Sequence, residues 1–174
     1  MTENEIRGLA DALHDAAVTK GFWCVDNAKD KHVAKWRGEL GEVIQADRMD
    51  MMYEVERDGA KPEGVAAELA DFVMMALDLF AAACLPLEEI LDGVVFSRKL
   101  NNEMALCALE VLVNSLYSAS CDIVEQETDY ERAVAFCIRG PEIWLKARGY
   151  DLWELIREKM AYNESRPMLH GRAY

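Results

Sequence analysis

Apolar residues recur every three or four positions along most of the chain, which is the spacing of one face of an α-helix. Ile6, Leu9 and Leu13 show this spacing in the first segment. No segment has the strict alternation of apolar and polar residues that indicates a half-buried β-strand. Only four prolines and ten glycines interrupt the pattern. The sequence therefore predicts an almost entirely helical protein of the all-α class.

Glycine and proline mark where these helices should end. Gly21 is a stop signal after the first helix, and the segment RDGAKPEG is typical of a loop after the second. We expect Gly140-Pro141 to break a later helix, because proline lacks a backbone donor and clashes with the preceding turn. The expected helices cover about 3–19, 31–56, 62–83, 103–125, 129–148 and 150–165, with another helical segment after Pro86 and an irregular tail.

Length and charge limit the kind of protein. The 174 residues, 52% of them hydrophobic, suffice for one sizeable core, so we expect a single domain over 1–174. The formal net charge is −13, and so acidic a chain is a poor non-specific ligand for nucleic acid or anionic membranes. We therefore expect no DNA, RNA or membrane partner, and a bound phosphate would need local cations or a metal ion.

The cysteines and the N-terminal segment indicate a cytoplasmic protein. The five cysteines form no CxxC pair, and their odd number argues against a disulfide framework, so we interpret them as reduced thiols. The segment MTENEIRGLADALHD carries charges throughout and lacks the apolar core of a signal peptide. The apolar run at 72–87 contains Asp78 and is shorter than the roughly 18 to 20 residues that a membrane span needs.

Two pairs of carboxylates stand out in these helices. Glu39 and Glu42 are three residues apart, and so are Glu68 and Asp71, so each pair lies on one helix face. Asp78 follows on nearly the same stripe as Asp71. A carboxylate in an apolar helix must be solvated, paired or bound to a cation. If the two helices pack antiparallel, as their short loop suggests, the pairs meet across the interface.

Oxygen ligands without His or Cys suit a hard ion, Mg²⁺ or Mn²⁺. The alternative is that these glutamates are ordinary solvated helix residues, since glutamate is a good helix former. A di-iron bundle would instead need two Glu-x-x-His motifs. We set it aside because none of His14, His32 and His170 follows a glutamate by three positions.

A second cluster of candidates lies near the C-terminus, where cations gather in an otherwise acidic chain. Lys159, Asn163 and Arg166 are four and three residues apart, so they share a helix face that can bind a polyanion. The alternative is a solvated helix end whose cations complement the helix dipole. His170 follows in the tail.

Four segments together resemble a known family. ALHDAAVTKGFW, WRGELGEVIQADR, ELADFVMMALDLFAAA and EKMAYNESRPMLHGRAY, in this order, are similar to segments of the MazG-like all-α nucleoside triphosphate pyrophosphohydrolases. The resemblance covers about 5–84 and 149–174. The intervening residues, about 85–148, are expected to be an inserted helical segment or a degenerate second copy of the module.

The resemblance implies an antiparallel helical bundle that cleaves a nucleoside triphosphate between the α and β phosphates, giving the monophosphate and pyrophosphate in nucleotide-pool sanitation. It also implies a homo-oligomer, for which we expect a dimer. The implied magnesium-binding and catalytic residues are Glu39, Glu42, Glu68 and Asp71, and the implied phosphate-side residues are Lys159, Asn163 and Arg166, with His170 and Tyr174 beside them.

Two points stay open at the level of sequence. Trp36, Trp23 and Phe22 are candidates to stack on the base, but the same residues suit a hydrophobic core. The second functional hypothesis is a non-catalytic helical module, descended from the same family, that binds a nucleotide or a protein.

Overall fold

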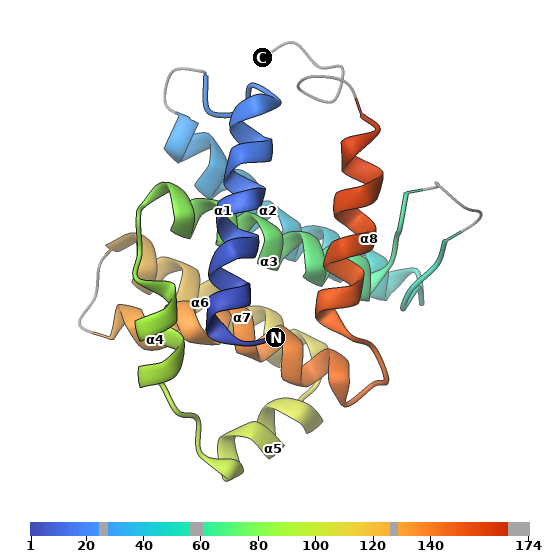
Figure 1. Cartoon of the computed structure of the whole chain (residues 1–174). Coiled ribbons are helices and arrows are strands. Elements are labelled where there is room, and N and C mark those ends of the chain that lie inside the picture. Colours follow the sequence, from blue (N-terminus) through green and yellow to red (C-terminus); the bar gives the residue numbers. More distant parts are fainter. Residues whose placement is uncertain (25–27, 56–60, 126–128, 167–174) are drawn as a thin grey trace.

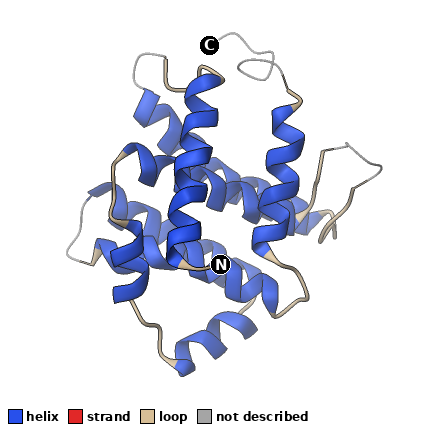
Figure 2. Cartoon of the chain, viewed as in Figure 1, coloured by secondary structure: helices blue, strands red, loops and turns tan. Residues whose placement is uncertain are grey.

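The computed structural model describes residues 1–24, 28–55, 61–125 and 129–166, and most of these residues lie in helices (Figure 1; Figure 2). Within the described ranges there is no β-strand; the nearest feature is an isolated antiparallel bridge between Glu54 and Glu63. The prediction of an all-α protein is confirmed. The eight helices of the described residues are α1 (Glu3–Thr19), α2 (Ala28–Arg48), α3 (Val65–Ala82), α4 (Leu87–Gly93), α5 (Arg98–Leu106), α6 (Leu109–Glu125), α7 (Tyr130–Lys146) and α8 (Leu152–Glu164).

The first helix has the limits that its sequence predicts. Thr2 caps α1 in a capping box with Glu5, in which each side chain binds the other residue's backbone N–H. Gly21, just beyond the end of the helix, has a φ of 86°, a conformation that glycine adopts without strain. Local signals at both ends therefore define α1.

The second helix ends at Arg48, eight residues before the expected limit near residue 56. The chain turns back at this point, because Asp50 has a φ of 56° and the N–H of Val65 binds the carbonyl of Met51 at 2.9 Å. Gly64 packs so closely here that a Cβ atom would lie 2.9 Å from the Met51 carbonyl oxygen. This close approach, which periodicity does not reveal, replaces the last two expected turns of α2.

Helices α2 and α3 pack antiparallel and form the centre of the molecule. Trp36 of α2 stacks on Phe72 of α3 with ring centroids 5.2 Å apart, and its edge meets Phe80 at 6.0 Å. Buried residues from α1, α2, α3, α4, α6, α7 and α8 belong to one connected hydrophobic cluster. Helices α1 and α8 each pack against α3, as Figure 1 shows.

The segment expected as an insertion, about 85–148, contains α4 to α7. Helices α6 and α7 pack along each other, and they contact α2 and α3 respectively. Arg37 of α2 donates to the hydroxyl and carbonyl oxygens of Ser120 on α6, both at 3.1 Å. The expected helix at 103–125 is two helices, because Cys107 has extended backbone angles between α5 and α6.

The prediction that Gly140-Pro141 breaks its helix is wrong. Helix α7 continues through Pro141 to Lys146. Pro141 removes one backbone hydrogen bond, but both Gly140 and Pro141 are buried, and Trp144 and Leu145 beyond them join the core. Tertiary packing thus outweighs the local cost of the proline.

Helix α8 begins at the expected place because Asp151 caps it. The Asp151 carboxylate accepts from the backbone N–H of Trp153 at 2.8 Å and of Glu154 at 3.2 Å.

Among the described residues no single helix is long and apolar enough to cross a membrane. Helices α3 and α4 meet that criterion only as a pair, with a 119° bend between them.

Candidate functional site

A cavity of about 710 Å³ lies among α1, α2, α3 and α8. One end carries the carboxylates of Glu39, Glu42 and Asp71 and the other carries His32 and Phe22, and three methionines also line the cavity. Its main polar and aromatic lining residues are Lys20, Phe22, Lys31, His32, Lys35, Glu39, Glu42, Lys61, Asp71, Asp78, Tyr162, Asn163, Glu164 and Arg166.

Three of the four predicted metal ligands converge at the acidic end. Carboxylate oxygens of Glu39, Glu42 and Glu68 all lie within 4.8 Å of one another. Glu39 and Glu42 are on adjacent turns of α2, and Glu68 faces them from the first turn of α3. The antiparallel packing of α2 and α3 thus brings together residues almost thirty positions apart in the sequence.

The electrostatics of this triad favour a bound cation. Burial, together with the nearby charges of Asp71 and Glu42, raises the pKa of Glu39 to about 8. Burial also raises the pKa of Glu68, whose Oε2 atom is buried and has no hydrogen-bond partner. A buried acceptor without a partner is costly. A hard cation with oxygen ligands would satisfy this atom and remove the repulsion among the three carboxylates.

The fourth predicted ligand, Asp71, has a different partner. Lys159 of α8 donates to Asp71 Oδ2 at 2.6 Å, and its Nζ lies 3.9 Å from Glu68 Oε1. Only 2% of Lys159 is exposed, so these carboxylates and not solvent are the main partners of its charge. Lys159 does not line the cavity, whereas Asp71 does. The lysine expected on the phosphate side is therefore a counter-ion of the acidic end.

A lysine that the sequence analysis missed lies beside the triad. Lys61, in the loop between α2 and α3, places its ammonium 3.8 Å from both Glu68 Oε1 and Glu63 Oε1. Its partial burial opposes the charged form, but Glu68 and Glu63 outweigh this effect and raise the pKa of Lys61. No helical periodicity includes this loop residue, so the sequence held no signal for it.

The other end of the cavity is organised around Asp78. Its Oδ1 atom lies 2.8 Å from His14 Nδ1, and it accepts from Trp23 Nε1 at 3.0 Å. His32 Nδ1 is 3.5 Å from Oδ2, and Trp23 stacks on the His32 ring with centroids 4.2 Å apart. Burial lowers the pKa of His32, although Asp78 partly opposes this shift. Asp78 thus has partners on α1, on α2 and in the segment that joins them.

The aromatic candidates are placed differently from one another. Trp36 is 1% exposed and does not line the cavity, so of the two alternatives that the sequence left open the structure places it not at the candidate site but in the core. It packs there because Phe72 and Phe80 face it on α3. Trp23 has one ring face covered by His32, and Phe22 lines the cavity.

Two residues of the C-terminal group reach the cavity. Asn163 and Arg166 line it, together with the α2 carboxylates. Lys20, at the end of α1, donates to the carbonyl oxygens of Glu164 and Arg166 and so joins the ends of α1 and α8. His170 and Tyr174 lie outside the described residues.

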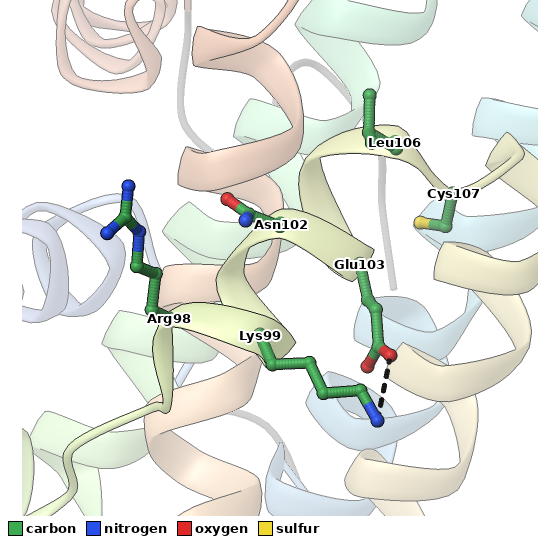
Figure 3. A pocket seen from close by; sticks show the side chains of 6 residues that line it. All are labelled: Arg98, Lys99, Asn102, Glu103, Leu106 and Cys107. Atoms are coloured by element: carbon green, nitrogen blue, oxygen red, sulfur yellow. Dashed lines mark ion pairs between the residues drawn. The ribbon is translucent and has the colours of Figure 1, made fainter.

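A second hollow, of about 650 Å³, lies on the surface of α5 and its C-terminal end. Figure 3 shows the six side chains that line it, including an ion pair of 3.7 Å between Lys99 and Glu103. Leu106 is 84% exposed. This hollow offers one intrahelical ion pair and no convergence of side chains from different helices, so the α1–α2–α3–α8 cavity is the better candidate site.

In comparisons with known proteins, no family model, curated protein or solved structure matches the chain.

Proposed function

We propose that the protein is a Mg²⁺-dependent nucleoside triphosphate pyrophosphohydrolase of the MazG-like all-α type, with Mn²⁺ able to replace Mg²⁺. The observation that carries the proposal is the triad of Glu39, Glu42 and Glu68. These side chains come from two helices and include one buried oxygen without a partner, on Glu68. Glu39 and Glu42 line a cavity that is also lined by cations.

The residues present fit a hard divalent ion. Glu39, Glu42 and Glu68 would hold it through oxygen atoms alone, which is the donor set that Mg²⁺ prefers. When bound, the ion would neutralise the triphosphate and lower the pKa of an attacking water molecule. Asp71, held by Lys159, lines the cavity beside the triad as a further carboxylate.

The two ends of the cavity suit different parts of the substrate, the phosphates at one end and the nucleobase at the other. Lys61, Asn163 and Arg166 supply a cation, an amide and a guanidinium for the phosphate oxygens, which carry most of the substrate's charge. The ring of Phe22 and the polar edge formed by His32 and Asp78 suit a nucleobase, which needs one flat apolar face and a few hydrogen bonds.

Hydrolysis would join the water oxygen to the α phosphorus and break the bond from that phosphorus to the bridging oxygen. The electron pair of the broken bond leaves with pyrophosphate, and a carboxylate at the acidic end takes the proton of the water molecule. The products are the nucleoside monophosphate and pyrophosphate.

A panel of ribo- and deoxyribonucleoside triphosphates, with Mg²⁺ or with EDTA, tests the proposal. We expect pyrophosphate and monophosphate from at least one nucleotide, with no turnover in EDTA. Glu39→Gln and Glu68→Gln should each lower kcat at least about 100-fold, because each removes a charged ligand of the metal ion. Glu110→Gln, at an exposed position on α6, is the matched control.

Release of inorganic phosphate with a nucleoside diphosphate would contradict the proposal, as would full activity of either triad variant. Nucleotide binding without turnover, seen as a rise in Tm, would instead identify the non-catalytic module.

We also propose a homodimer. Large apolar side chains are exposed on the inserted segment, among them Val95 and Leu106, each 84% exposed. The homodimer rests on the family resemblance, and these side chains are candidates for its interface. Sedimentation equilibrium should give twice the chain mass of 19.7 kDa, and a mass of one chain at micromolar concentration would contradict the dimer.

A further inference from the structure

Along the face of α2 that lines the cavity, the charged side chains change from positive to negative. Lys31, Lys35, Glu39 and Glu42 are spaced by four, four and three residues, so they share one face, and all four line the cavity. Two cations thus precede two carboxylates on the same helix. The proposed mechanism uses the carboxylates and leaves the cations without a function.

Lys35 lies between the two ends of the cavity. Its positive charge acts to lower the pKa of Glu39 on one side and the pKa of His32 on the other. Helix geometry puts Lys35 about 6 Å along the axis from Glu39, at 1.5 Å per residue. The Lys35 ammonium is 5.4 Å from the centroid of the Phe22 ring, which also lines the cavity.

Three other lysines near the cavity are held by protein groups that the structure identifies. Lys159 is buried against Asp71, and Lys61 pairs with Glu63 and Glu68 at the acidic end, where the proposed function already uses it for the phosphate oxygens. Lys20 donates to backbone carbonyl oxygens at the end of α8. For Lys35, by contrast, the described part of the chain shows the aromatic contact and no ion pair. An exposed ammonium at this place is available to a ligand.

We propose that Lys35 binds the phosphate group next to the nucleoside, between the acidic triad and the end of the cavity formed by Phe22, His32 and Asp78. This inference rests on the proposed function. In this arrangement the metal-bound phosphates lie at Glu39 and the base lies near His32. Lys35 lies between these two residues on α2, so the α phosphate is placed beside its ammonium. An ammonium is a compact point charge with three donors, well suited to oxygens whose charge changes during phosphoryl transfer.

The sequence resemblance implies a phosphate-side role for Lys159, and the proposal gives Lys35 such a role at the α phosphate. The α phosphate carries the phosphorus that water attacks, so Lys35 would stabilise negative charge on its non-bridging oxygens as the bond to the leaving pyrophosphate breaks. Removing the ammonium should therefore reduce kcat more than it raises KM.

The test compares Lys35→Met, Lys35→Arg and Lys29→Met with the wild-type chain. Lys29 is an exposed lysine on the same helix that does not line the cavity, so its loss changes the net charge equally. With the best nucleotide, Lys35→Met should lower kcat/KM about 100-fold, in the range found for removing one transition-state donor. Lys35→Arg should retain at least a tenth of the activity, and Lys29→Met should match the wild type within twofold.

Activity of Lys35→Met within twofold of the wild type would overturn the inference and leave the proposed function intact. If the wild type hydrolyses no nucleotide, the proposed function fails, and calorimetric titration with inorganic tripolyphosphate and Mg²⁺ then decides about Lys35. Binding by the wild type that Lys35→Met weakens at least tenfold would support a phosphate contact at Lys35. Equal binding by both proteins, or no binding by the wild type, would overturn it.

Discussion

Lys159 on α8 and Asp71 on α3 form a buried ion pair with 2.6 Å between Nζ and Oδ2. The pair attaches the C-terminal helix to the acidic end of the cavity. Because Lys159 also lies 3.9 Å from Glu68 Oε1, one ammonium offsets the charge of two carboxylates that would otherwise repel each other. The site is thus partly neutralised by the protein itself.

Loss of this ammonium should destabilise the fold. Lys159→Met leaves Asp71 and Glu68 without their shared cation, and breaking one side of a buried ion pair typically costs about 3–5 kcal/mol. We expect a loss of about 3 kcal/mol in the free energy of unfolding, because Asp71 faces the cavity and keeps some solvent. Urea unfolding in EDTA measures this loss. The double variant Lys159→Met, Asp71→Asn should be less destabilised than the sum of the single variants, and strict additivity would contradict the coupling.

The metal-free protein should lose stability as the pH rises. The folded state holds the Glu39 proton up to a pH of about 8, whereas the ordinary pKa of this carboxyl group is 4.5. Between these values the native state binds more protons than the unfolded state, so the free energy of unfolding falls with increasing pH. This contribution is fully present below pH 4.5 and is lost as the pH passes the folded pKa.

Urea unfolding in EDTA between pH 5 and pH 9 measures the effect. Glu39→Gln cannot ionise, so its stability should vary less over this range and exceed that of the wild type at pH 9. Glu110→Gln should keep the wild-type dependence, since Glu110 is exposed. Parallel curves for the wild type and Glu39→Gln would show that the Glu39 carboxyl group has an ordinary pKa.

Trp36 should matter for stability and not for substrate affinity. It stacks on Phe72 in the core, so Trp36→Ala should cost about 3–5 kcal/mol in unfolding free energy. Trp36→Phe keeps an aromatic ring and removes an indole N–H that is buried without a partner, so KM should stay within twofold of the wild type. A tenfold rise in KM for folded Trp36→Phe would place this residue at the substrate after all.

Asp78 should contribute to binding of the nucleoside part alone. Asp78→Asn removes the charge that Trp23 Nε1 contacts at 3.0 Å and that lies 2.8 Å from His14 Nδ1. We expect about tenfold weaker binding of the nucleoside monophosphate, comparable to one hydrogen bond to a charged group, and unchanged binding of pyrophosphate. Calorimetry with both ligands checks this, with the exposed Asp92→Asn as control. Equal weakening of both ligands would contradict the assignment of the two cavity ends.

Local signals in the sequence determined much of the fold. The capping box of Thr2 and Glu5 and the Asp151 cap set the starts of α1 and α8, because each satisfies backbone donors within a few residues. The same reasoning failed at Pro141, where buried neighbours in α7 outweigh a local helix breaker. It also failed near residue 50, where α2 ends earlier than the periodicity predicts. The segment after α2 instead accepts backbone hydrogen bonds from the N–H groups of Glu63 and Val65.

For the site, the sequence by itself determined that Glu39 and Glu42 share one helix face and that Glu68 and Asp71 share another, because helical spacing fixes these neighbours. Only the tertiary structure decided that Glu68 joins the α2 pair while Asp71 binds Lys159, and that Trp36 lies in the core. It also brought Lys61 to the triad and His14 to Asp78. These contacts join separate helices and loops, and their geometry depends on how the helices pack, which no residue spacing within one helix specifies.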